Sequence, residues 1–161
     1  MMFSRDAEGV RPQGSPMPII TPAYLVVIAV PGANPPGFPP LIGVPPAVGH
    51  AYPLLPAGNV ISREPTPGAT IVLPWWNVSR RQTQIDFDGQ STWDIQDLSS
   101  RNGTCVNGQQ LQPYAPWPLC DGDRIQVAGI AGVELRFTFH PVKVARRPQA
   151  LEAFLQQDEF R

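Results

Sequence analysis

From Tyr52 onward, turn residues divide the sequence into short runs of mixed apolar and polar residues. The dipeptides Asp88-Gly89 and Asn107-Gly108 favour tight hairpins, because their residues tolerate the positive φ that such turns need. In residues 83–87 (TQIDF), the first, third and fifth side chains share one face, which is the period of a half-buried strand. Eight runs are predicted as strands: residues 59–63, 71–73, 83–87, 93–97, 105–106, 109–111, 124–127 and 134–139. Many short strands with regular turns indicate an all-β, antiparallel sandwich or barrel.

Proline is concentrated in the first part of the chain. Fifteen of the 21 prolines lie between Pro12 and Pro67, and no Asp, Glu, Lys or Arg occurs from Pro12 through Ser62. A disordered linker is usually richer in charge, so this segment is predicted to pack on the domain or on a partner. Residues 31–46 cannot form a helix or a central strand, because proline lacks the N–H that both need. They are predicted to form a long loop that either covers a sheet or carries function. Before the loop, residues 24–30 (YLVVIAV) are predicted as a first strand.

A chain of 161 residues suits one domain with short extensions. We expect a flexible N-terminal extension over residues 1–20, the sandwich over residues 21–142 with the Pro-rich insertion at 31–46, and a C-terminal tail over residues 143–161. Within the tail, Leu151, Phe154 and Leu155 make a narrow apolar stripe, which predicts a short helix over residues 150–160.

Charge and hydropathy argue against several classes of protein. A formal net charge of −1 gives no field that would attract nucleic acid. The most apolar stretch, residues 19–30, is too short to span a bilayer. No secretory signal is visible at the N-terminus. The two cysteines are too few for a disulfide scaffold. They are expected to be buried thiols, and their spacing leaves a single disulfide open.

Enzyme signatures are absent from the sequence. It contains no Gly-x-Ser-x-Gly, no P-loop, no dinucleotide glycine fingerprint and no paired metal-ligand motif. His50 and His140 lie far apart, and a structural or surface histidine is the commoner case for such positions. We therefore predict no catalytic residue, no metal ligand and no cofactor.

Three polar motifs lie between the predicted strands, at residues 61–64 (ISRE), 77–81 (NVSRR) and 97–104 (DLSSRNGT). Loops at one end of an antiparallel sandwich come together, so the polar side chains of these motifs are expected to share one patch. Such a patch suits phosphate. Arginine offers charge-assisted and often bidentate contacts, and Ser hydroxyl, Asn amide and backbone N–H groups supply further donors.

The run DLSSRNGTCVNG (residues 97–108), preceded by NVSRR and followed by CDGDRIQV, resembles the signature of the forkhead-associated (FHA) family. The resemblance covers residues 59–139, about half of the chain. It implies an eleven-stranded FHA-type antiparallel β-sandwich, here with a long Pro-rich loop near the N-terminus and a short C-terminal helix. It also implies a phosphothreonine-peptide-binding adaptor module in protein phosphorylation signalling, whose partner is a phosphothreonine-containing protein. The Pro-rich segment is a possible additional protein contact. A stand-alone domain of this kind resembles bacterial signalling adaptors, which suggests the cytoplasm.

The resemblance assigns a binding role to five residues. Arg63 resembles the arginine that pairs with phosphate, and Ser79 resembles the serine that hydrogen-bonds a phosphate oxygen. Arg80 occupies a position that often makes a further contact, and Arg101 one that can touch phosphate or the threonine methyl group. Asn102 resembles the asparagine that holds the peptide backbone. Five other residues resemble structural positions around the site: Asp97, Gly103, Thr104, Asn107 and Gly108.

The sequence also departs from the family pattern. Ser62 and Gln82 stand where the family usually has Gly and His, which puts the precision of the site in question. Trp75 and Trp76 cannot both face inward on an extended chain, so one of them either borders the peptide groove or packs on the Pro-rich loop. The alternative is a degenerate FHA domain that acts as a phospho-independent scaffold or oligomerisation module through residues 12–62. Arg63 turned into the sheet would favour that alternative.

Overall fold

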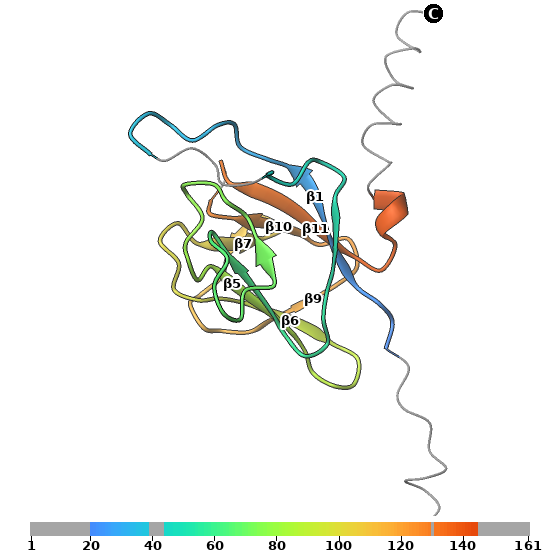
Figure 1. The fold of residues 1–161 in the computed structure, drawn as a ribbon. Helices are drawn as coiled ribbons and strands as arrows, with labels where there is room; N and C mark the ends of the chain where they lie inside the picture. The colour runs from blue at the N-terminus through green and yellow to red at the C-terminus, as the bar shows by residue number, and fades with distance from the viewer. Residues whose placement is uncertain (1–19, 39–43, 130, 145–161) are drawn as a thin grey trace, which may run out of the picture.

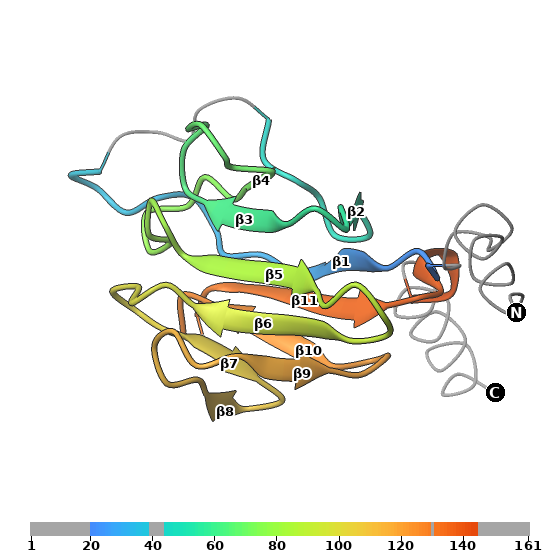
Figure 2. The same cartoon turned by 90° about the horizontal axis from the view of Figure 1, so that it is seen from below.

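The computed structural model describes residues 20–38, 44–129 and 131–144. Within these ranges eleven strands form two sheets, which Figures 1 and 2 show as the layers of a sandwich. The first sheet has the order β2 (Ala51–Pro53), β1 (Tyr24–Ala29), β11 (Val133–Thr138), β10 (Arg124–Val127), β7 (Thr104–Val106) and β8 (Gln109–Gln110). The second has the order β4 (Ile71–Val72), β3 (Asn59–Ser62), β5 (Thr83–Phe87), β6 (Trp93–Asp97) and β9 (Trp117–Leu119). The predicted eleven-stranded β-sandwich is confirmed.

The core lies between the two sheets and is built from alternate residues of their strands. In β6, Trp93, Ile95 and Asp97 are buried while the two residues between them are half-buried. β11 alternates in the same way over most of its length. Facing residues from both sheets are fully buried, among them Leu25, Val27, Ile61, Ile85, Ile125, Leu135 and Phe137. This alternation gives each sheet one apolar face, and the two apolar faces pack against each other. The packed sheets position the loops at the ends of the strands.

Two strands were not predicted from the sequence, and each contains a proline. Pro53 lies in β2 and Pro118 lies in β9. β2 and β9 are edge strands of their sheets, where a missing N–H removes no ladder hydrogen bond on the open side. The predicted antiparallel pairing also has one departure, because β3 and β4 pair in parallel through Ile61↔Ile71 and Ser62↔Val72.

The Pro-rich loop connects β1 to β2, and its described residues contain no strand or helix. It contacts the rest of the domain at two points near Trp76. The backbone N–H of Trp76 donates to Asn34 Oδ1 at 3.0 Å. The ring centroids of Phe38 and Trp76 lie 5.0 Å apart. Part of the loop therefore packs on the domain, and Figure 1 shows it projecting at one end of the sandwich.

The segment after β11 forms one helical turn over residues 141–144, in which Val144 N–H donates to the carbonyl of His140 at 3.2 Å. The helix predicted over residues 150–160 and the N-terminal extension up to residue 19 lie outside the described residues. No helix in the described ranges is long and apolar enough to cross a membrane.

The two cysteines have free thiols. Cys105 is half-buried on β7, whereas Cys120 is exposed in the turn between β9 and β10. The expectation of burial was therefore wrong for Cys120. Its turn is formed by Asp123, whose carboxylate accepts the backbone N–H of Cys120 at 2.8 Å and keeps this residue on the surface.

Candidate functional site

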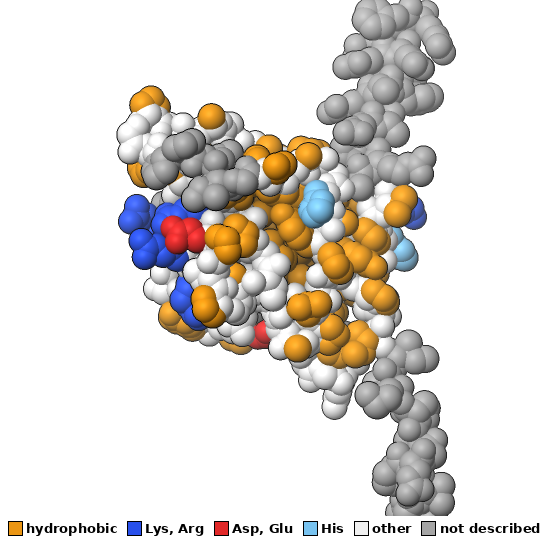
Figure 3. All heavy atoms as spheres, viewed as in Figure 1, with side chains coloured by type: hydrophobic (Ala, Val, Ile, Leu, Met, Phe, Trp, Pro, Cys, Tyr) orange, Lys and Arg blue, Asp and Glu red, His pale blue; other side chains and the backbone are white. Residues whose placement is uncertain are grey.

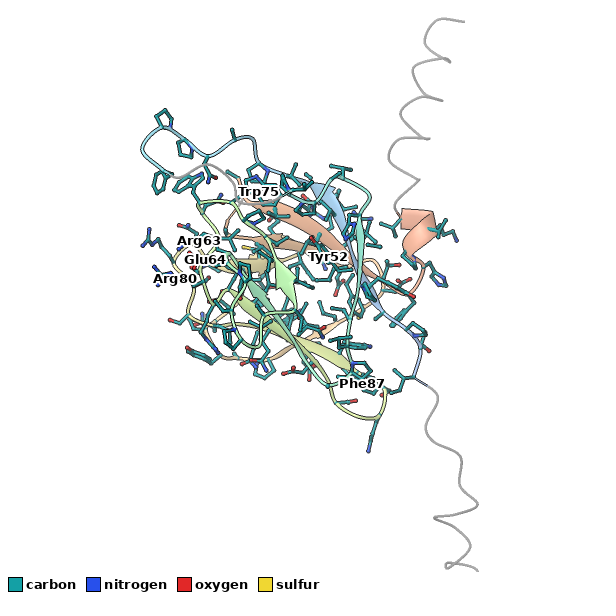
Figure 4. All side chains as sticks on the ribbon, in the orientation of Figure 1. Tyr52, Arg63, Glu64, Trp75, Arg80 and Phe87 are labelled. Carbon is teal, nitrogen blue, oxygen red and sulfur yellow. The ribbon has the colours of Figure 1, made fainter. Side chains whose placement is uncertain are left out.

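Three loops at one end of the sandwich surround a pocket of about 330 Å³. They are the β3–β4, β4–β5 and β6–β7 connections. Figure 4 shows Arg63, Glu64 and Arg80 close together at this end. The pocket is lined by Arg63, Trp76, Asn77, Val78, Ser79, Arg80, Arg101 and Asn102. All five residues that were predicted to bind ligand therefore lie around one cavity, and their roles toward a ligand stay predictions.

Arg63 directly follows β3 and is held at the pocket by its backbone. Its N–H donates to the carbonyl of Ser79 at 3.0 Å, which ties the first loop to the second. Its guanidinium makes two long contacts, Nη1 with the carbonyl of Val78 at 3.4 Å and Nη2 with Glu64 Oε2 at 3.5 Å. The side chain is 30% exposed, so it is not turned into the sheet. Because both contacts are at the weak end of the hydrogen-bond range, an anion in the pocket can replace them.

Ser79 connects the second loop to the third. Its Oγ accepts the backbone N–H of Arg101 at 3.0 Å. A hydroxyl that accepts one hydrogen bond still has its own hydrogen to donate. Ser79 is therefore positioned at the pocket wall as a donor for an oxygen of a bound ligand.

Asn102 lies across the same pocket on the third loop. Its Nδ2 donates to the carbonyl of Asn77 at 2.9 Å. This contact uses one amide hydrogen and leaves the Oδ1 face of an exposed side chain for other partners. The amide can thus both donate to and accept from a peptide backbone that passes over the pocket.

A charge cluster surrounds the pocket. Glu64 Oε2 lies 3.5 Å from Arg63 Nη2 and 3.9 Å from Arg80 Nε. Figure 3 shows basic side chains gathered at this end of the molecule around an acidic one. Three arginines and one carboxylate give the cluster a local excess of positive charge, although the whole chain carries a formal net charge of −1.

Gln82 connects the second and third pocket loops through hydrogen bonds of its buried side chain. It is fully buried, and its Oε1 accepts the backbone N–H of Ser79 at 2.8 Å. Its Nε2 lies within hydrogen-bond distance of Ser100 Oγ, the Gly103 carbonyl and Thr104 Oγ1, at 3.0, 2.9 and 3.2 Å. One neutral amide therefore joins the loop that carries Ser79 to the loop that carries Arg101 and Asn102.

Asp97 supports the third loop at its start. It is buried, and its carboxylate accepts the backbone N–H of Ser100 at 3.0 Å and the hydroxyls of Ser100 and Thr104 at 2.6 and 2.7 Å. Gly103 closes the same loop with φ of 83°, a conformation that favours glycine. Asp97, Gly103 and Thr104 thus lie beneath the pocket and shape the loop.

Asn107 and Gly108 are placed differently. They form the β7–β8 turn with φ of 52° and 86° and are not among the residues that line the pocket. The side chain of Asn107 donates to Asp123 Oδ1 at 2.9 Å and accepts the backbone N–H of Arg124 at 2.8 Å. Their contribution is therefore to hold the hairpin against the turn that precedes β10.

Only one of the two adjacent Trp side chains faces the core, as predicted from the sequence. Trp75 is buried in the core, whereas Trp76 is 37% exposed and lines the pocket. Both alternatives for the exposed Trp hold, because it borders the pocket and also packs on Phe38 of the Pro-rich loop. Asn77 begins the polar motif at residues 77–81, but no role was predicted for it from the sequence. It is buried, and its Oδ1 has no hydrogen-bond partner among the described residues. Its position in the pocket lining follows from the convergence of the loops, because the motif by itself does not show which side chains face the pocket.

Comparisons with known proteins agree with the fold described above. The family model described as FHA domain matches residues 60–128. An FHA domain solved in a study of phosphothreonine-dependent FHA domain interactions is 30% identical, with a TM-score of 0.52, covering 73% of this chain and 96% of that chain. The FhaA FHA domain, complexed with the intracellular domain of Rv3910, is also 30% identical, with a TM-score of 0.50 and coverages of 71% and 98%. EmbR of Mycobacterium tuberculosis, in complex with a low-affinity phosphopeptide, is 27% identical, with a TM-score of 0.54 and coverages of 84% and 30%. No curated protein matches the sequence.

Proposed function

Because this chain belongs to the FHA family, we propose that it is a phosphothreonine-peptide-binding adaptor module in protein phosphorylation signalling. The observation that carries the proposal is the convergence of Arg63, Ser79 and Asn102, from three separate loops, on one pocket. The module recognises a phosphorylated protein and performs no catalysis, and it needs no metal or cofactor for binding. The proposed partner is a phosphothreonine-containing protein rather than a nucleic acid, and its compartment, the cytoplasm, stays a prediction.

Electrostatics supports a phosphate as the ligand. A phosphothreonine carries a charge of about −1.5 to −2 at pH 7 and three acceptor oxygens. Arg63 is the residue that pairs directly with the phosphate. Its backbone is hydrogen-bonded to Ser79, and its guanidinium makes only long contacts within the protein, which the phosphate can replace. Arg80 and Arg101 add attraction from the pocket rim, since both are exposed.

The neutral donors supply orientation. The hydroxyl of Ser79 donates to a phosphate oxygen while it still accepts the N–H of Arg101. Asn102 pairs with the backbone of the peptide beside the phosphothreonine, while its own contact with Asn77 keeps the amide in place. The buried Gln82 and Asp97 fix the conformation of both loops through hydrogen bonds. The loops therefore lose little conformational entropy when the peptide binds.

Two relatives supply a precedent for a peptide or protein ligand. EmbR is described in complex with a phosphopeptide, and the FhaA domain in complex with an intracellular domain. The position of Arg63 also weighs against the alternative of a scaffold that has lost phosphate binding, because its side chain opens to the pocket. An additional protein contact through the Pro-rich segment remains part of the proposal.

The proposal is tested by titrating the protein with a degenerate phosphothreonine peptide library, with unphosphorylated and phosphoserine libraries as controls. We expect binding only to the phosphothreonine library. Arg63→Ala is expected to weaken that binding about 100-fold, since a charge-assisted pair is lost. Arg124→Ala is the matched control, because this arginine is 44% exposed on β10 and does not line the pocket. Binding that ignores the phosphate, or is equally strong in Arg63→Ala, would leave the scaffold as the function.

A further inference from the structure

We propose that Phe38 and Trp76 form an aromatic platform that binds an aliphatic or aromatic side chain of the phosphopeptide, close in sequence to its phosphothreonine. The platform is defined as the exposed rings of these two residues. This inference rests on the proposed function and adds a determinant of sequence preference, which the phosphate pocket alone does not provide.

Trp76 belongs to the pocket and is not used by the core. Its neighbour Trp75 fills the core position and is 2% exposed, whereas Trp76 is 37% exposed. Trp76 is also among the residues that line the pocket, next to Asn77 in the chain. A peptide held at Arg63 and Asn102 therefore passes a large exposed ring.

Phe38 extends this surface from a different part of the chain. It is 47% exposed, and its ring is tilted by 38° to that of Trp76 at a centroid distance of 5.0 Å. Asn34 fixes the approach, because its Oδ1 accepts the backbone N–H of Trp76 at 3.0 Å. The Phe38 N–H donates to the carbonyl of Pro35 at 3.2 Å, which closes a local turn in the loop. The Pro-rich loop thus presents Phe38 beside Trp76 by both a ring contact and a hydrogen bond.

The phosphate pocket and the aromatic platform recognise different parts of the peptide. Every phosphothreonine presents the same phosphate to the arginines, so the pocket distinguishes phosphorylated from unphosphorylated peptides and not one phosphopeptide from another. Discrimination requires contacts with neighbouring side chains. Two large rings offer apolar area at low cost in side-chain entropy, and Trp is over-represented among residues that dominate binding.

The occupant is apolar rather than charged. The segment from Pro12 through Ser62, which contains Phe38, has no Asp, Glu, Lys or Arg. This segment offers a charged peptide side chain no ion pair to replace its lost hydration, whereas an aliphatic or aromatic side chain gains from leaving water. The arginines that line the pocket beside Trp76 are engaged by the phosphate, so the platform favours an apolar side chain.

The test compares phosphothreonine peptides in which one flanking position at a time carries Leu, Phe, Gly or Asp. For the wild-type protein we expect at least one position at which Leu or Phe binds about five- to tenfold more tightly than Gly. Phe38→Ala should remove most of this preference while retaining phosphothreonine-dependent binding of the Gly peptide. Trp76→Ala, at a residue that lines the pocket, should remove the preference as well. Trp76→Phe should retain part of the preference. Trp117→Ala is the matched control, because Trp117 is 38% exposed on the edge strand β9 and does not line the pocket.

The outcomes separate the platform from the site. If the wild-type protein binds phosphothreonine peptides without any apolar preference, or both platform variants keep it, the platform is wrong and the proposed function stands. If the wild-type protein binds no phosphothreonine peptide, both are wrong. Thermal unfolding of each variant shows whether a loss of peptide binding is caused by misfolding. If Trp76→Ala does not fold, the loop variant Phe38→Ala decides, since Phe38 is not part of the core cluster.

Discussion

Ser62 ends β3 beside Arg63, yet it is not among the residues that line the pocket. It is fully buried, and its hydroxyl has no hydrogen-bond partner among the described residues. The residue that stands in place of the family's usual glycine therefore adds a buried hydroxyl, which we expect to lower stability. A buried hydroxyl without a partner loses its hydration and gains nothing in return.

Ser62→Ala is expected to raise the free energy of unfolding by about 1 kcal/mol, because it removes the unpaired hydroxyl and keeps the β-carbon. Urea unfolding measures this change. Ser62→Gly is the control, and it should lower stability because glycine is unfavourable within a strand. Phosphopeptide affinity should stay the same in Ser62→Ala. A loss of stability in that variant would show that the hydroxyl is paired, for example with water.

Gln82 illustrates a residue whose role depends on its surroundings. In sequence it lies between two predicted strands, where the family usually has His. In the fold it is fully buried and reaches the backbone of Ser79 and the carbonyl of Gly103. Its amide has no ionisable proton, so the brace between the two loops does not change with pH in the range where histidine titrates.

Among the elements, the β7–β8 hairpin is tied to the rest of the sheet through its turn. Asn107 both adopts a positive φ and binds the β10 side through Asp123 and the N–H of Arg124. The sequence predicted this turn correctly, because Asn-Gly is the commonest pair for it. It did not reveal the long-range hydrogen bonds, which depend on where the turn before β10 lies.

Two substitutions separate the contribution of the backbone conformation of Asn107 from that of its side-chain hydrogen bonds. Asn107→Gly keeps the backbone conformation and loses the two side-chain hydrogen bonds, so we expect it to cost about 1–2 kcal/mol of stability. Asn107→Ala also strains the turn and is expected to cost about 1 kcal/mol more. Urea unfolding of both variants measures the difference. Equal stability of the two would contradict the argument that the positive φ matters at this position.

At the scale of the whole molecule, the acid–base behaviour of binding follows from where the histidines lie. His50 packs its ring on Tyr52 of β2 at a centroid distance of 4.5 Å, and His140 follows β11. Neither lines the pocket, whose charged groups are arginines and the neighbouring Glu64. Among the described residues, no group of three His, Cys, Asp or Glu side chains is placed to hold a metal ion. We therefore expect the pH dependence of binding near neutral pH to come from the phosphate of the ligand.

Affinity for a phosphothreonine peptide is expected to fall about fourfold between roughly pH 7.5 and 5.5, because the phosphate gains a proton with a pKa of about 6. The dianion pairs better with the arginines, so the loss follows the fraction of dianion. Titrations at a series of pH values measure it. His50→Ala and His140→Ala should give the same profile as the wild-type protein. A profile displaced by either variant would place a titrating histidine in the binding equilibrium.

The sandwich and the order of the site motifs can be predicted from the sequence, because alternation, turn residues and the FHA signature are local patterns. Residues 83–87, 93–97 and 124–127 were predicted with the bounds that the strands have. The two strands that contain Pro53 and Pro118 were not, since their tolerance of proline depends on an edge position that no local pattern encodes. The contact of Phe38 with Trp76, the burial of Asn77 and the bracing by Gln82 likewise arise from segments far apart in the sequence. Local patterns therefore specify strands and turns. Which side chains share the pocket follows from the packing that brings distant loops together.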